Sequence, residues 1–120
     1  MDIEYTAEED AFRAEVRDFI AQNHSDEIKA KTAKSLTGYI HKEDHIAWQK
    51  ALHKKGWIAP NWPVEHGGPG WSATQKYIYE TEMMQAGCLR PVAFGLKMVA
   101  PVIMEFGTEE QKKKFLPDIL

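Results

Sequence analysis

Two histidines, His41 and His45, have a type and spacing that could do chemistry, because side chains four residues apart share one helix face and can bind one metal ion. The stretch HKEDH lacks the glutamate position of the zinc-protease motif, however, and offers no third ligand nearby. We therefore interpret both residues as solvated or core-edge histidines.

The other reactive side chains are isolated. Glu80 and Glu82 lie two residues apart on an expected helix, so their carboxylates face different ways and do not form an acid–base pair. Cys88 follows Gly87 at an expected helix end without a cationic motif, which favours a buried structural thiol. His66 lies in a glycine-rich loop, where it could donate a hydrogen bond to a ligand or stabilise a turn.

Composition excludes several classes of protein. The chain has 120 residues and a formal charge of −3 with both signs mixed, so it shows no electrostatic footprint for nucleic acid. No apolar run approaches the roughly 20 residues of a membrane span. One cysteine cannot form an internal disulfide, and the N-terminus does not resemble a signal sequence. A cytoplasmic protein is expected.

The hydrophobic pattern predicts an all-α fold, a small bundle of about five to six helices in one domain, residues 1–120. No alternating strand pattern exceeds four residues. Capping boxes are expected at Thr6 with Glu9 and at Ser72 with Gln75, and the sequence Thr108-Glu109-Glu110-Gln111 is expected to cap the last helix. The expected helices span residues 7–22, 41–56, 72–87, 92–106 and 109–115, with a short helix or ordered loop at 25–38.

The segment 56–72, GWIAPNWPVEHGGPGWS, carries three of the chain's four tryptophans. Its prolines fix backbone torsions and its glycines permit conformations closed to other residues, so the loop has a defined shape. One interpretation is that Trp57, Trp62 and Trp71 pack back on the helices. The alternative is that the loop meets another domain or a ligand.

The segment 91–106, PVAFGLKMVAPVIMEF, is apolar nearly all round, because Lys97 and Glu105 are its only charged residues. Pro101 is expected to kink this helix. Such a helix is either the centre of the core or an element whose exposed face is sealed by protein or ligand outside these 120 residues. We infer the second, since few short helices are present to surround it.

Three stretches together carry a family resemblance. The loop GWIAPNWPVEHGGPGWS, the glutamate-containing helix after it and the terminal FGTEEQKKKFLPDIL resemble the N-terminal helical domain of the acyl-CoA dehydrogenases. The resemblance spans roughly the whole chain and is weakest at residues 25–38. The chain stops at the apolar KKKFLPDIL, so we expect a truncated fragment of a three-domain flavoenzyme.

The resemblance implies an oxidoreductase of fatty acid metabolism that binds FAD between a middle β-domain and a C-terminal helical domain. A glutamate of the C-terminal domain removes the α-proton of the acyl-CoA thioester, and the β-hydride passes to the flavin. Neither catalytic nor cofactor-binding residues are then expected in this chain, and alone it should be inactive. The implied partners are an acyl-CoA, the missing domains, an electron-accepting flavoprotein and further copies in a homo-oligomer.

The resemblance also implies that Pro91, Phe94, Gly95 and Met98 line the acyl end of the substrate pocket. A glycine permits close approach of a ligand, methionine forms an adaptable apolar wall, and phenylalanine shapes a cavity. Ordinary core packing is the alternative for these four residues. Arg90 and Pro91 stand where many relatives carry small polar residues, so the substrate class stays open.

Two other functions remain as hypotheses. A free-standing helical interaction module would use the same scaffold to bind a partner, without any flavin chemistry. A related flavin-dependent oxidase or monooxygenase is the other alternative, because the residues that separate these reactions lie outside the present chain.

Overall fold

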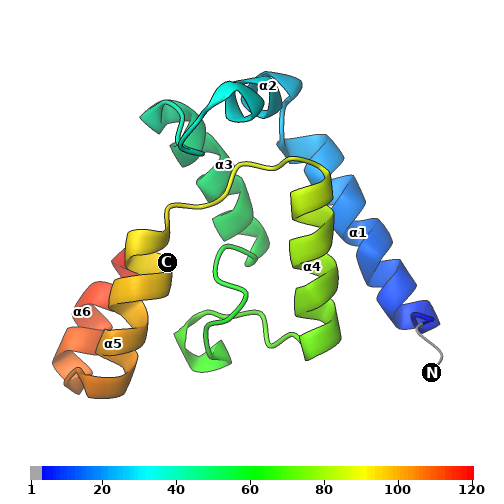
Figure 1. Ribbon diagram of the computed structural model, residues 1–120. Helices are drawn as coiled ribbons and strands as arrows, with labels where there is room; N and C mark the ends of the chain where they lie inside the picture. The colour runs from blue at the N-terminus through cyan, green and yellow to red at the C-terminus, as the bar shows by residue number, and fades with distance from the viewer. Residues whose placement is uncertain (1–3) are drawn as a thin grey trace. The chain divides into compact units, whose positions relative to one another are not determined.

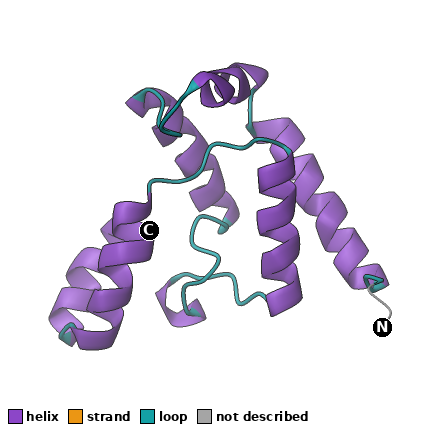
Figure 2. Cartoon of the chain, in the orientation of Figure 1, coloured by secondary structure: helices purple, strands orange, loops and turns teal. Residues whose placement is uncertain are grey.

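The computed structural model describes residues 4–120, and these form helices and loops without a strand (Figures 1 and 2). The predicted all-α class is therefore confirmed. The elements are α1 (Ala7–Asn23), α2 (Asp26–Lys34), α3 (Lys42–Lys55), the short 3₁₀ turn η1 (Val64–His66), α4 (Ala73–Gln85), the π-helical turn η2 (Phe94–Val99), α5 (Ala100–Phe106) and α6 (Glu109–Ile119).

The chain divides into two compact units, and the boundary falls within α3. The first unit consists of Met1–Trp48 and Trp71–Arg90, and the second consists of Gln49–Gly70 and Pro91–Leu120. Each unit combines two separate stretches of sequence. That residues 1–120 behave as one domain stays a prediction.

Reciprocal capping boxes fix the starts of three helices. At α1 the Thr6 hydroxyl accepts the Glu9 backbone N–H at 3.2 Å, while the Glu9 carboxylate accepts the Thr6 N–H at 2.8 Å. Each box satisfies two of the backbone donors that a helix start leaves open. The same arrangement begins α4 at Ser72 and α6 at Thr108. The predicted starts of these helices are confirmed.

The core of the first unit lies where α1 packs along α4, as Figure 1 shows. The apolar face of α1 is buried there against Ile78 and Tyr79 of α4. Half-buried Trp71 joins this unit through its ring, which lies 4.9 Å from the Tyr79 ring between centroids. The buried residues of α1 are Phe12, Val16, Phe19 and Ile20.

The core of the second unit forms where α5 packs beside α6 and the tryptophan-rich loop folds back. Trp57 and Trp62 are both buried, and the Trp62 indole donates to the Leu96 carbonyl at 2.8 Å. The interpretation that these tryptophans pack back on the helices is confirmed. The loop contributes residues to both units, because it belongs to the second unit as far as Gly70 and Trp71 packs in the first unit.

Three expected boundaries differ from the structure. The helix expected at 92–106 is π-helical over Phe94–Val99 and becomes α-helical only at Ala100. The ordered segment at 25–38 is helical over Asp26–Lys34 alone. The last helix continues to Ile119 instead of ending at residue 115, although Pro117 lies inside it. Burial of Leu116 in the core outweighs the one backbone hydrogen bond that Pro117 removes.

Candidate functional site

An exposed row of large apolar side chains runs along η2 and α5 of the second unit. We call Phe94, Met98, Val102 and Phe106 the apolar strip. Their exposed fractions are 61%, 58%, 57% and 82%, whereas Leu96 and Ala100 of the same segment are buried. The four residues are spaced four apart, and the π-helical turn over Phe94–Val99 keeps the first two in line with those of α5, so the strip forms one surface. The segment is therefore half in the core and half uncovered by the described residues 4–120.

The four predicted pocket residues occupy different surroundings. Phe94 and Met98 lie together on the apolar strip, and Pro91 is half-buried just before η2. A Cβ placed on Gly95 would lie 2.9 Å from Ile119 Cγ2, so the close approach that this glycine permits is that of α6. The structure thus brings two of the four residues together on one exposed surface.

The start of η2 is anchored by a side chain from α3. The backbone N–H of Val92 donates to Gln49 Oε1 at 2.8 Å, and both residues belong to the second unit. This bond fixes the chain two residues before Phe94. The side chains of the strip therefore begin from a defined backbone position.

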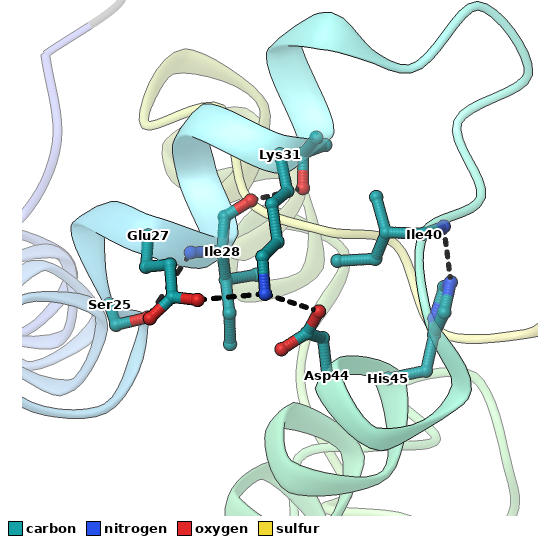
Figure 3. A network of polar contacts seen from close by, with 8 residues as sticks. Ser25, Glu27, Ile28, Lys31, Ile40, Asp44 and His45 are labelled. Atoms are coloured by element: carbon teal, nitrogen blue, oxygen red, sulfur yellow. Dashed lines mark hydrogen bonds and ion pairs between the residues drawn. The ribbon is translucent and has the colours of Figure 1, made fainter.

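His41 and His45 do not share a helix face, because His41 precedes the first residue of α3 and only His45 lies in the helix. His41 is exposed, while His45 is buried and its Nε2 accepts the backbone N–H of Ile40 at 3.3 Å (Figure 3). Among residues 4–120 no three metal-ligating side chains come together. The interpretation of core-edge and solvated histidines is confirmed, since His45 holds the loop that precedes α3.

A lysine joins α2 to the start of α3 beside this histidine. Lys31 Nζ lies 2.8 Å from a Glu27 carboxylate oxygen and 2.9 Å from Asp44 Oδ2. Figure 3 shows both contacts as dashed lines. The hydrogen bond to Glu27, followed by that to Asp44, raises the pKa of Lys31. These charges therefore link α2 to the start of α3.

Glu82 is the most enclosed carboxylate of the described chain, and two arginines of α1 hold it. Its oxygens accept from Arg13 Nε at 2.7 Å and from Arg17 Nε at 2.7 Å. Glu80 is exposed, so the two glutamates do face different ways. The cluster was not predicted from the sequence, although Arg13 and Arg17, four apart on one face of α1, are the signal that could have indicated it.

Acid should weaken the first unit through Glu82. The Arg17 hydrogen bond, followed by that of Arg13, lowers the pKa of Glu82 below its ordinary 4.5 despite its burial. A lowered pKa means that the stabilisation is complete above about pH 4.5 and is lost as the pH falls through the folded-state value. Urea unfolding across this pH range should show that the free energy of unfolding falls more steeply with acid for the native chain than for Glu82→Gln.

Glu80→Gln is the matched control, because it removes an exposed carboxylate from the same helix. Its unfolding free energy should follow the native pH dependence. Identical acid profiles for the native chain and Glu82→Gln would contradict this role of the carboxylate.

The single cysteine is unreactive in this structure. Cys88 is half-buried, and burial raises the pKa of its thiol to about 11. The thiolate, which is the nucleophilic form, is therefore scarce at neutral pH. The structural interpretation of Cys88 is supported, and its side chain has no part in the site.

Four helix starts of the described chain carry their own side-chain caps, at Thr6, Ser25, Ser72 and Thr108. These caps occupy backbone donors that could otherwise bind an anion. In residues 4–120 the buried side-chain atom without a hydrogen-bond partner is His45 Nδ1, in the first unit. That this chain holds no cofactor-binding residue stays a prediction.

No helix within residues 4–120 combines the length and apolar character needed to cross a membrane.

Comparison with protein families gives a match over residues 6–120 to the family described as acyl-CoA dehydrogenase, N-terminal domain. The chain is 38% identical over 112 residues to acyl-CoA dehydrogenase IpdE1 of Mycolicibacterium smegmatis, covering 91% of this chain and 29% of that protein. It is 36% identical to acyl-CoA dehydrogenase FadE26 of Mycobacterium tuberculosis, covering 99% and 30% of the two chains. The mouse mitochondrial long-chain specific acyl-CoA dehydrogenase is 31% identical, with coverage of 96% and 25%.

Solved structures agree with these relatives. A chain of the ChsE4–ChsE5 complex from Mycobacterium tuberculosis matches with a TM-score of 0.71 and 33% identity, covering 99% of this chain and 29% of that one. A chain of the Tcur3481–Tcur3483 steroid ACAD matches with a TM-score of 0.75 and 34% identity, covering 99% and 30%. The chain thus spans less than a third of the length of these relatives.

Proposed function

Because the chain belongs to the acyl-CoA dehydrogenase family, whose N-terminal domain it matches, we propose that it forms one wall of the acyl pocket in an FAD-dependent acyl-CoA dehydrogenase. The reaction of that enzyme would be α,β-dehydrogenation of an acyl-CoA thioester. The exposed apolar strip carries this proposal, since a surface of four large apolar side chains needs an apolar neighbour.

The wall begins with Phe94 and Met98, and Pro91 precedes them in the chain. Gly95 serves the wall indirectly in this proposal, because it lets α6 pack close behind these residues. Burying one large apolar side chain against an acyl group stabilises by about 1.5–3 kcal/mol. An aromatic ring gives the wall shape, and a thioether adapts to the substrate that it contacts. The role of these residues is to bind and orient the acyl group and to exclude water from it.

The chemistry belongs to the rest of the enzyme. FAD, when bound, supplies the acceptor for the hydride, and the residues that hold it lie outside this chain. The base that removes the α-proton is likewise assigned to another domain. We also propose that an electron-accepting flavoprotein is a partner of the complete enzyme. The proposed location of the enzyme is the cytoplasm.

The substrate class that we propose is a bulky, steroid-derived acyl group. Support comes from the similarity to chains of the Tcur3481–Tcur3483 steroid ACAD at 34% identity. Both solved structures are of paired proteins, ChsE4–ChsE5 and Tcur3481–Tcur3483. We therefore also propose an oligomeric assembly that includes a second, different dehydrogenase subunit. The homo-oligomer expected from the sequence is the alternative, and mass measurement of the purified assembly separates the two.

A chimera tests the pocket wall. In it the matching N-terminal segment of Mycolicibacterium smegmatis IpdE1 is replaced by this chain. We expect the chimera to retain flavin and to bleach the flavin colour on addition of a steroid-derived acyl-CoA. Phe94→Ala or Met98→Ala should then raise KM about tenfold, which corresponds to ~1.4 kcal/mol of lost contact.

Leu36→Ala is the control, because Leu36 is fully exposed and belongs to the first unit. Its KM should stay at the value of the parent chimera. A chimera that binds flavin and oxidises the acyl-CoA with the same KM in all three variants would refute the pocket-wall role of the strip. Preference for a straight-chain acyl-CoA would refute the steroid class alone.

A further inference from the structure

One backbone carbonyl in η2 cannot be satisfied by its own helix. The N–H of Ala100 donates to the Gly95 carbonyl, five residues earlier, in the π-helical pattern. The next donor in that pattern would be the N–H of residue 101, and its acceptor would be the Leu96 carbonyl. Residue 101 is a proline and has no N–H.

The Trp62 side chain supplies the missing donor. Its indole Nε1–H donates to the Leu96 carbonyl oxygen at 2.8 Å, and both residues are buried. A buried carbonyl without a partner is destabilising, because water cannot reach it. The tryptophan from the loop thus replaces a bond that the helix has lost at Pro101.

Backbone hydrogen bonds within the loop hold Trp62 in place. Its backbone N–H donates to the Ala59 carbonyl at 3.1 Å. The following turn closes on the Pro63 carbonyl, which accepts from His66 and from Gly68 at 3.0 Å each. The indole is therefore presented by a rigid segment, and little ordering is needed when it meets η2.

The register of η2 decides which side chains reach the apolar strip. In an α-helix each residue advances by about 100° around the axis, so conversion of the π turn to an α turn would rotate Phe94 relative to Val102 by roughly that angle. Phe94 would then leave the line of Val102 and Phe106. The π register is consequently a condition for the strip as observed.

We propose that Trp62 is a positioning residue: its indole replaces the donor that Pro101 lacks and holds η2 in the π register that places Phe94 and Met98 on the strip. The assignment of the strip to an acyl pocket rests on the proposed function. The bond between Trp62 and Leu96, and its link to Pro101, do not depend on that function.

A double-mutant cycle on the full 120-residue chain tests this coupling. Trp62→Phe keeps an aromatic ring and removes the N–H, so amide exchange of Ala100 should accelerate about tenfold or more. Pro101→Ala gives residue 101 an N–H and frees the helix to supply a donor to Leu96. In that background Trp62→Phe should accelerate the exchange of Ala100 less than about threefold.

The carbonyl ¹³C chemical shift of Leu96 gives a second readout, because it reports the hydrogen bond that this carbonyl accepts. If Trp62 acted by packing alone, Pro101→Ala would not restore this shift. It should change in Trp62→Phe and return toward the native value in the double variant. If Trp62→Phe unfolds the chain, restoration of the fold by Pro101→Ala supports the proposal, and failure to restore it overturns the proposal.

Trp57→Phe is the matched control, because Trp57 is also buried in the same loop. Trp57→Phe should change the amide exchange of Ala100 by the same factor in the native background and in the Pro101→Ala background. Equal effects of Trp62→Phe in both backgrounds would overturn the positioning role. The amide-exchange and ¹³C readouts use no substrate, so a negative result there would not contradict the pocket-wall proposal. Conversely, unchanged KM values in the chimera would not contradict the coupling between Trp62 and Pro101.

Discussion

Replacing Gly68 by alanine is expected to destabilise the second unit strongly. The added Cβ would overlap the Trp62 carbonyl oxygen and lie 2.5 Å from the carbonyl carbon. Backbone atoms cannot rotate away as a flexible side chain can, so the loop itself must move. We expect a loss of about 3 kcal/mol or more, since overpacking of this kind displaces the buried Trp62 ring as well.

Gly56→Ala separates this clash from the general cost of losing a glycine. Gly56 has a φ of +80°, which disfavours alanine by about 1–2 kcal/mol, but nothing lies within 4 Å of its added Cβ. Urea unfolding, followed by the amide signals of Leu96 and Ala100, should therefore give Gly68→Ala a much lower free energy of unfolding than Gly56→Ala. Equal losses for the two variants would show that the packing of Gly68 on Trp62 has been overstated.

Helix starts could be predicted from the sequence because they depend on residues three apart. Thr6 with Glu9, Ser72 with Gln75 and the box at Thr108 each complete their hydrogen bonds within one turn. No distant contact is needed to decide them. The all-α class follows from the same local information, together with the absence of an alternating pattern.

The π-helical turn could not be predicted in this way. Pro101 signals a disturbance in the helix, and a kink was the natural expectation. The form of the disturbance depends on Trp62, which is 34 residues away from Leu96 in the sequence. The end of α6 is likewise set by burial of Leu116 in the second unit, a contact that no local rule contains.

The pocket role of the candidate site stays a prediction. The resemblance implies that Phe94 and Met98 line the acyl pocket, and the structure leaves both exposed on the apolar strip. Gly95 was expected to admit a ligand, but the added Cβ would meet Ile119 of α6. That close approach arises from tertiary packing between two helices, so neither composition nor spacing could indicate it.

The reactive side chains of the chain are used for structure. His45 Nε2 accepts from the Ile40 backbone, Glu82 is held by two arginines, and burial keeps the Cys88 thiol protonated. A domain whose enclosed histidine, carboxylate and thiol are engaged in this way can still contribute shape. This is the physical reason why the apolar strip, and no polar cluster, carries the proposed function.

Trp48→Ala should be the most damaging change in the first unit. Trp48 is 1% exposed, and its ring lies 5.8 Å from Phe19 and 4.8 Å from His24 between centroids. Its indole donates to the Leu89 carbonyl at 2.7 Å, while His24 Nε2 accepts the Leu89 N–H at 3.0 Å. Truncation leaves a cavity and an unpartnered buried carbonyl, so we expect a loss of about 3–5 kcal/mol.

Two further variants divide this loss by cause. Trp48→Phe retains much of the ring volume and removes the donor to Leu89, so it should cost about 1–3 kcal/mol. Tyr77→Ala removes an aromatic ring that is 62% exposed on α4 and should cost much less. Chemical denaturation followed by amide signals of α1 and α4 measures all three. A Trp48→Ala loss no larger than that of Tyr77→Ala would show that the indole does not hold Leu89 in the core, because burial and the hydrogen bond both require the larger effect.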